Sequence, residues 1–147
     1  MSFRYSFQQI VDLKNNERAQ AEWILSEAMG QLRNEETNLH GLFEQKESLH
    51  NDMVQASMHS VSISNMLMMQ NYMNHVDKQI AKKHQDVRHA QVVVSQKQNH
   101  LSEKMIDEKV WTKAREKAHN QFQLMIAKKE QDALDEMATN RYKRVSY

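Results

Sequence analysis

The sequence predicts an all-α fold, a long antiparallel two-helix coiled-coil hairpin with a longer second helix. Proline is absent and glycine occurs only twice in 147 residues, so the residues that most often interrupt helices are nearly missing. Only 39% of the residues are apolar, which suits a rod with a narrow apolar seam better than a compact core. We expect one domain over residues 1–147, with helices at about 3–56 and 66–139, a turn at 57–65 and a tail at 140–147.

The predicted turn is the interior stretch where the helical pattern gives way. Residues 57–65 contain four serines and end at Asn65. These short polar side chains bond to nearby backbone groups, which favours turns and helix caps over helix interiors. We therefore expect the chain to reverse direction here.

The first helix carries an apolar seam at alternating spacings of three and four residues, the a/d pattern of a coiled coil. Its positions are Leu25, Ala28, Leu32, Glu35, Leu39, Leu42, Lys46, Leu49, Met53 and Ala56. Glu35 and Lys46 are polar. Each either fixes the register or lies where the partner helix leaves room for a long side chain.

Upstream of Leu25 the seam is less regular. One apolar edge is formed by Phe3, Phe7, Ile10 and Leu13. Lys14 and Arg18 take the positions where the seam would continue, as at a stutter. Trp23 lies off the seam, so it either widens the core face or is an exposed aromatic anchor for a partner.

The second helix repeats the seam. Its positions are Met66, Met69, Met73, Val76, Ile80, Lys83, Val87, Ala90, Val94, Lys97 and Leu101. After Leu101 the apolar stripe no longer holds one heptad phase, which indicates a helix whose packing partner changes or thins.

The two helices differ in expected length. At 1.5 Å per residue they are roughly 80 Å and roughly 110 Å long, so the second extends beyond the first or curves past it. Phe122, Met125 and Ile126 then either form an exposed docking surface or pack against the apolar residues near the N-terminus. Near the turn, Met68 and Tyr72 fit the seam poorly and are candidates for an exposed contact.

The sequence offers little for catalysis. With no cysteine and no two histidines three or four residues apart, it predicts neither a disulfide nor a metal site. We find no phosphate-binding glycine loop and no nucleophile with a supporting base. We therefore expect no enzyme activity, no cofactor and no small-molecule substrate.

Charge is divided between the halves. Residues 1–56 carry nine acidic and five basic side chains, a net charge of −4, and residues 57–147 carry ten and fifteen, a net charge of +5. In the second half, basic residues alternate with acidic ones around the helix, unlike a phosphate-tracking face. We expect no nucleic-acid partner. With neither a signal peptide nor a membrane-spanning run, we expect a soluble chain.

Both ends carry motifs of a known family. The opening reads Phe3-Arg4-Tyr5-Ser6-Phe7-Gln8-Gln9-Ile10-Val11-Asp12-Leu13-Lys14. The far end reads Glu130-Gln131-Asp132-Ala133-Leu134-Asp135-Glu136-Met137-Ala138, followed by Arg141. Together they resemble the two ends of the bacterial flagellar export protein FliJ family. Asp132 departs from the pattern, in which a basic residue is usual.

This resemblance implies a soluble component of the flagellar type III export apparatus, folded like the central stalk subunit of rotary ATPases. The implied partners are the export ATPase hexamer, the cytoplasmic part of the membrane export gate, and export chaperones. The implied ATPase-docking residues are Phe3, Arg4, Phe7, Gln8, Glu130, Gln131, Asp135, Glu136 and Arg141. The candidates for the gate contact are Leu42, Met68, Tyr72 and Val76.

The implied location is the cytoplasm, peripheral to the inner face of the cell membrane at the flagellar base. Two other interpretations stay open from the residues alone. One is a generic coiled-coil scaffold or dimerisation protein, and the other is a nucleic-acid binder that uses its basic helix.

Overall fold

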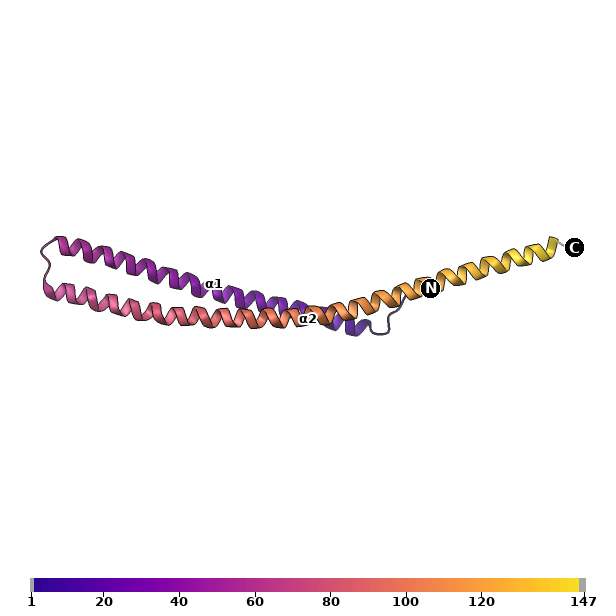
Figure 1. The fold of residues 1–147 in the computed structure, drawn as a ribbon, viewed down its shortest axis with the longest axis horizontal. Helices are drawn as coiled ribbons and strands as arrows, with labels where there is room; N and C mark the ends of the chain where they lie inside the picture. The colour runs from indigo at the N-terminus through magenta and orange to yellow at the C-terminus, as the bar shows by residue number, and fades with distance from the viewer. Residues whose placement is uncertain (1, 146–147) are drawn as a thin grey trace. The chain divides into compact units, whose positions relative to one another are not determined.

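The computed structural model describes residues 2–145 as two helices joined by a short loop (Figure 1). Helix α1 spans Gln8–Met58 (51 residues) and helix α2 spans Ile63–Val145 (83 residues). The prediction of an all-α hairpin with a longer second helix is confirmed. The chain forms two compact units, which we call the tip unit (residues 20–101) and the terminal unit (residues 2–19 with 102–145).

Helix α1 begins at Gln8 rather than near residue 3. The backbone N–H of Gln8 donates to the Tyr5 carbonyl at 3.1 Å, and the N–H of Val11 donates to the Phe7 carbonyl at 3.1 Å. Before this turn, the rings of Phe3 and Tyr5 stack at 6.5 Å, and those of Tyr5 and Phe7 meet at 5.7 Å. Contacts between alternate residues are typical of extended backbone, in which side chains repeat every second residue.

The loop between the helices covers residues 59–62, which is shorter than the predicted turn. Ser57 stays helical, and its hydroxyl donates to the Val54 carbonyl at 2.7 Å. The Ser62 hydroxyl accepts from the Asn65 backbone N–H at 3.2 Å, so Ser62 is the N-cap of α2. The serines therefore act as capping residues, as the sequence indicated, but they occupy the helix ends as well as the loop.

Helix α2 also continues past residue 139, where the sequence predicted its end. Thr139 stays in the helix with its hydroxyl bonded to the Asp135 carbonyl at 2.9 Å. Lys143 and Arg144 lie in the last turn, where positive charge interacts favourably with the helix dipole. The expectation of a single domain over residues 1–147 stays a prediction.

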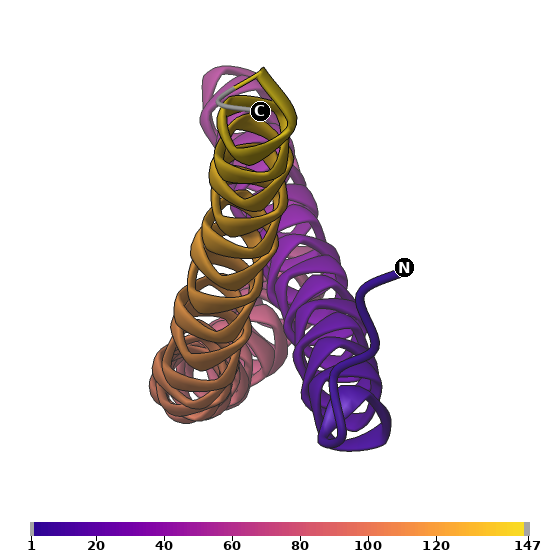
Figure 2. The same cartoon turned by 90° about the vertical axis from the view of Figure 1, so that its right-hand side faces the viewer.

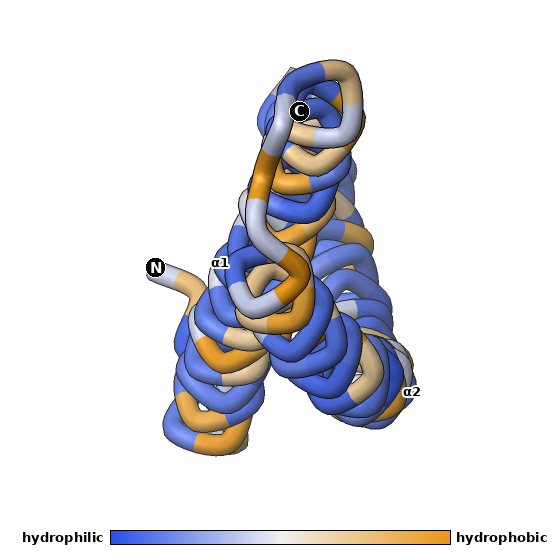
Figure 3. The backbone as a smooth tube through the Cα atoms, turned by 90° about the vertical axis from the view of Figure 1, so that its left-hand side faces the viewer, coloured by the Kyte–Doolittle hydropathy of each residue, from blue (hydrophilic) through white to orange (hydrophobic). Residues whose placement is uncertain are grey.

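The predicted seams form the interface of the tip unit. All ten seam positions of α1 and all eleven of α2 are buried or half-buried. The buried members are Met73, Val76, Ile80, Val87, Ala90 and Val94, and Ala21 of α1, which precedes the seam, is buried in the same unit. Figure 3 shows hydrophobic residues interspersed among more numerous hydrophilic ones in both helices. The coiled-coil pattern predicted from residue spacing is thus confirmed within this unit.

Glu35, Lys46 and Lys83 of the seam form ion pairs across the helix pair. The Lys83 ammonium lies 2.9 Å from the Glu35 carboxylate, and the Lys46 ammonium lies 2.8 Å from the Asp77 carboxylate. Of the two possibilities for Glu35 and Lys46, the structure favours fixation of register, because each pair joins one residue of α1 to one residue of α2.

Candidate protein-docking surfaces

An aromatic cluster holds the N-terminal segment on α2 in the terminal unit. The Phe3 ring lies 4.8 Å from the His119 ring, edge to face, and 5.4 Å from the Phe122 ring. The Arg115 guanidinium lies over the Phe3 ring at 5.8 Å, a cation–π geometry. Phe122 therefore packs against an apolar residue near the N-terminus, Phe3, and does not form an exposed docking surface.

The next residues of the opening motif continue this contact. The Phe7 ring lies 6.0 Å from the Trp111 ring yet is 49% exposed. The Gln8 side chain accepts a hydrogen bond from Arg115 at 2.7 Å and donates one to Asp12 at 2.9 Å. Arg4 is exposed. Of the four candidate residues here, Arg4 and Phe7 thus present the most surface to a partner.

Beyond this cluster, ion pairs replace the apolar seam. The Lys14 ammonium lies 3.0 Å from the Asp107 carboxylate. Beside this pair, the Lys104 ammonium lies 3.3 Å from the Glu17 carboxylate, and the Arg18 guanidinium pairs with the Glu108 carboxylate. We call these six residues the ionic clasp. Lys14 and Arg18 do occupy the interface, as extrapolation of the seam indicated, and opposite charges on α2 accommodate them.

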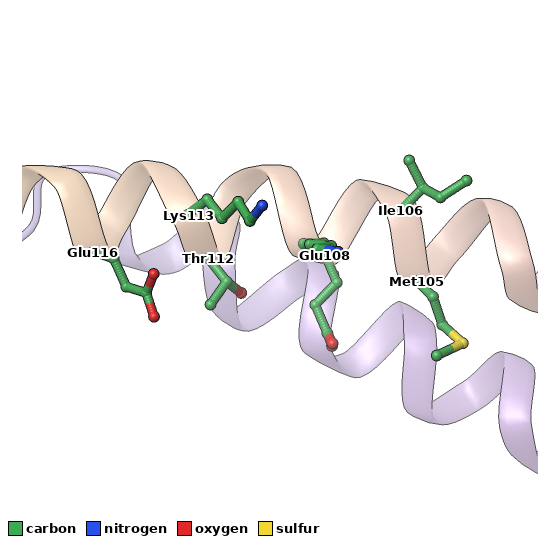
Figure 4. Close-up of a pocket in the computed structure, with 7 residues that line it drawn as sticks. Met105, Ile106, Glu108, Thr112, Lys113 and Glu116 are labelled. Atoms are coloured by element: carbon green, nitrogen blue, oxygen red, sulfur yellow. The ribbon is translucent and has the colours of Figure 1, made fainter.

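The ionic clasp also affects the pKa of Lys14. The hydrogen bond from Lys14 to Asp107, together with the negative charges of Asp107 and Glu17, raises the pKa of Lys14 above its usual range, and partial desolvation opposes this effect. Figure 4 shows Glu108 of the clasp extending from α2 toward α1, whereas Ile106 points away from α1. The shallow open groove drawn there, of about 460 Å³, is lined by residues of α2 alone, so it is a helix surface and not an enclosed active site.

Sequence analysis missed the clasp, although a signal for it exists. Positions 14, 17 and 18 carry charges in the order plus, minus, plus, and positions 104, 107 and 108 carry plus, minus, minus. Opposed positions of an antiparallel pair have residue numbers with a constant sum, and Lys14 with Asp107 and Glu17 with Lys104 both add to 121. Complementary charges at a constant sum are therefore the signal for these two pairs, whereas Arg18 and Glu108 add to 126 and lie outside this register.

The C-terminal motif lies on an uncovered part of α2. Residues 127–144 are all exposed; Figure 2 views this part of α2 from its C-terminal end. The exposed candidates are Glu130, Gln131, Asp135, Glu136 and Arg141. Within this set the Gln131 amide donates to the Asp135 carboxylate at 3.1 Å. Ordinary packing therefore ends near Ile126, which is half-buried, and Met125 is already 43% exposed.

The two terminal motifs lie in one unit but contact different neighbours. Phe3 packs at Phe122, and Glu130 lies eight residues further along α2, about 12 Å at 1.5 Å per residue. A partner that touches both motifs must therefore extend along the helix.

The candidate residues for the export-gate contact, all in the tip unit, differ in how exposed their side chains are. Met68 and Tyr72 are exposed, and Leu42 is half-buried. The Tyr72 hydroxyl bonds to the Gln45 amide, which anchors the ring beside α1. Val76 is 0% exposed, so its side chain belongs to the core and no partner can touch it directly. Trp23 is exposed, which favours the anchor interpretation over the core one.

No group of three or more His, Cys, Asp or Glu side chains among the described residues is arranged to hold a metal ion. Neither helix, as far as it is described, contains a stretch apolar enough to span a bilayer.

The seam and the exposed terminal helix define a two-helix coiled-coil hairpin protein with surfaces suited to protein partners. The model of the flagellar FliJ protein family matches residues 3–146, and the chain belongs to this family. It is 25% identical over 142 residues to the flagellar FliJ protein of Bacillus subtilis (strain 168), covering 97% of each chain. Its fold is similar to that of CT670 from Chlamydia trachomatis, described as a proposed YscO homolog, with a TM-score of 0.64 over 97% of this chain and 96% of that one at 17% identity.

Family membership confirms the resemblance seen at the two ends of the sequence. The chain is a component of flagellum biogenesis and type III protein export. Members of the FliJ family are non-catalytic components of the export apparatus.

Proposed function

We propose that this chain is a stalk-like adapter of the flagellar export machine. Its terminal unit docks in the ring of the export ATPase and promotes assembly and activity of that enzyme. Other surfaces link the ATPase to the cytoplasmic part of the export gate and to export chaperones. The chain itself catalyses nothing, and it works in the cytoplasm, peripheral to the inner face of the cell membrane at the flagellar base.

The uncovered end of α2 carries this proposal. Glu130, Leu134, Met137 and Arg141 follow one another at spacings of four, three and four, so they form one stripe along the helix. Leu134 and Met137 are 60% and 61% exposed. An apolar centre flanked by an acidic and a basic residue is typical of a helix face that docks on another protein.

The opening motif supplies a second part of the docking surface. Arg4 and Phe7 are exposed on the segment that packs against α2. Phe3 and Gln8 hold that segment in place through their contacts with Phe122 and Arg115, so we assign them a positioning role in docking.

The gate contact rests on fewer residues. Met68 and Tyr72 are accessible, and Leu42 is partly so. Val76 supports this surface from the core rather than touching the gate. The chaperone role is supported by family membership alone.

The test is ATP hydrolysis by the purified export ATPase in the presence of this chain. Leu134→Gln with Met137→Gln removes the apolar centre of the stripe and keeps helix propensity nearly unchanged. Val92→Gln is the matched control, because Val92 is 54% exposed on α2 in the tip unit. The proposal predicts that the double variant stays helical by circular dichroism and loses stimulation, while the control stimulates fully. Equal stimulation by all three proteins would favour a generic scaffold.

A further inference from the structure

Large apolar side chains are exposed on both sides of the loop that joins the helices. Met58 at the end of α1 is 71% exposed, and Ile63 at the start of α2 is 80% exposed. Leu67 and Met68 are 58% and 68% exposed. We call residues 54–72 the hairpin tip. Several large exposed apolar side chains thus lie within one short segment, and exposed apolar surface marks interaction sites.

The apolar residues of the tip do not share one face. Leu67 and Met68 are successive residues of α2, about 100° apart around the helix, yet both are strongly exposed. On α1, Val54 and Met58 are four positions apart, so they lie on one face of the helix, and this face is also exposed. A helix end that is apolar on several faces suits a concave partner that surrounds it better than a flat one.

The tip is also nearly free of charge. Between Glu47 and Asp77, the only Asp, Glu, Lys or Arg is Asp52, although 27% of the whole chain is charged. Depletion of charge is characteristic of the buried core of protein interfaces. The partner surface that complements this tip is therefore apolar and uncharged.

The polar groups of the loop favour a protein over a lipid bilayer. Residues 59–62 are not helical. The His59 N–H donates to the Ala56 carbonyl and the Ser62 carbonyl accepts from the Met66 N–H, but Ser60 and Val61 between them lie outside the helical hydrogen-bond ladder, and hydrocarbon would offer their backbone groups no partners. The tip also lacks the lysines and arginines that attract anionic headgroups. A protein cavity supplies hydrogen-bond partners for the loop and for the serine hydroxyls beside it.

We infer that the hairpin tip is a plug for a concave, apolar and uncharged socket in a partner protein. This inference rests on the proposed function in identifying that partner as the cytoplasmic part of the export gate. It goes further by naming the loop-proximal residues Met58, Ile63 and Leu67 as the anchors and by predicting a contact that salt does not weaken.

The experiment measures binding of the full chain to the purified cytoplasmic part of the gate at about 50 mM and about 500 mM NaCl. The tip variant carries Met58→Gln, Ile63→Gln and Leu67→Gln, and Val92→Gln is the control because Val92 is 54% exposed elsewhere in the same unit. All three substituted side chains of the variant are exposed, so its helicity and melting temperature should match those of the control.

The inference predicts that affinity of the unaltered chain changes by less than about twofold between the two salt concentrations. The tip variant should bind about tenfold more weakly or worse, as expected for loss of apolar anchors, while still stimulating the ATPase. The control should bind normally.

Other outcomes overturn the inference in distinguishable ways. If the unaltered chain and the tip variant bind the gate equally well, the tip is not the binding surface, although the proposal that the chain binds the gate still holds. Binding that salt abolishes would likewise contradict an uncharged socket. If the unaltered chain does not bind the gate, the gate role itself fails. Tip-dependent binding to phosphatidylcholine vesicles, or tip-dependent dimers in sedimentation, would reassign the tip to lipid or to a second copy.

Discussion

The Lys83 ammonium of α2 lies 2.9 Å from the Glu35 carboxylate of α1. Both residues occupy seam positions that are otherwise mostly apolar, and both are partly shielded, with exposed fractions of 29% and 16% for the side chains of Lys83 and Glu35. A slip of register would separate these charges and place one of them against an apolar neighbour, so the pair selects one alignment of the helices.

Charge reversal tests this pair. We expect Glu35→Lys to lower the melting temperature, because two cations would then face each other in the seam. Adding Lys83→Glu to the same chain should recover most of the loss, because the pair is restored with its signs exchanged. Thermal unfolding followed by circular dichroism is the measurement. Glu36→Lys is the control, since Glu36 is exposed beside Glu35, and an equal loss in that control would contradict a specific pair.

The same pair predicts how stability responds to alkaline pH. The hydrogen bond to Glu35 raises the pKa of Lys83 above its usual range, with help from the charges of Glu35 and Asp86 and against partial desolvation. A lysine whose pKa is higher in the folded state stabilises fully below its unfolded-state value, about 10.4, and this contribution is lost as pH rises through the folded value. We expect the melting temperature to fall above about pH 10.4, and to fall less steeply in Lys83→Met.

The ionic clasp predicts unequal salt sensitivity of the two units. Its three interhelical pairs are partly exposed, and exposed charges are screened strongly at about 1 M salt. The tip unit instead relies on buried apolar residues such as Ile80 and Val87. Hydrogen exchange of residues 8–19 should accelerate in high salt, while that of residues 76–94 should change little. Uniform acceleration along both segments would show that the clasp does not hold the terminal unit.

The buried seam predicts a large effect from a small deletion. Val76 is fully buried, so Val76→Ala should reduce the free energy of unfolding by about 1–3 kcal/mol through lost burial and a residual cavity. Val92→Ala, at an exposed position of the same helix, should change it by about 0.5 kcal/mol or less. Urea denaturation of both variants provides the comparison. Similar losses would mean that the seam is not the core.

Periodicity in the sequence was sufficient to predict the seam, because a/d spacing reports directly which side chains face the partner helix, and the serines of residues 57–65 predicted the reversal of the chain. Periodicity was insufficient at the N-terminus, where α1 begins only at Gln8 and the rings of Phe3 and Phe7 contact α2 from the non-helical segment before it. The ionic clasp was not predicted, because its charged side chains interrupt the apolar periodicity that indicates a helix interface in a sequence. At the C-terminal end, the motif provided Glu130 and Arg141 as docking candidates, whereas the exposure of Leu134 and Met137 between them is seen only in the structure.

The central claim is that the uncovered end of α2 docks in the export ATPase. Because the chain has no cysteine, a single Met137→Cys substitution allows an environment-sensitive fluorophore to be placed on the stripe, and Val92→Cys places the same label in the tip unit. On addition of the purified ATPase, the claim predicts a blue shift and protection from a soluble quencher at position 137, with no change at position 92. A response at position 92 and none at position 137 would contradict it.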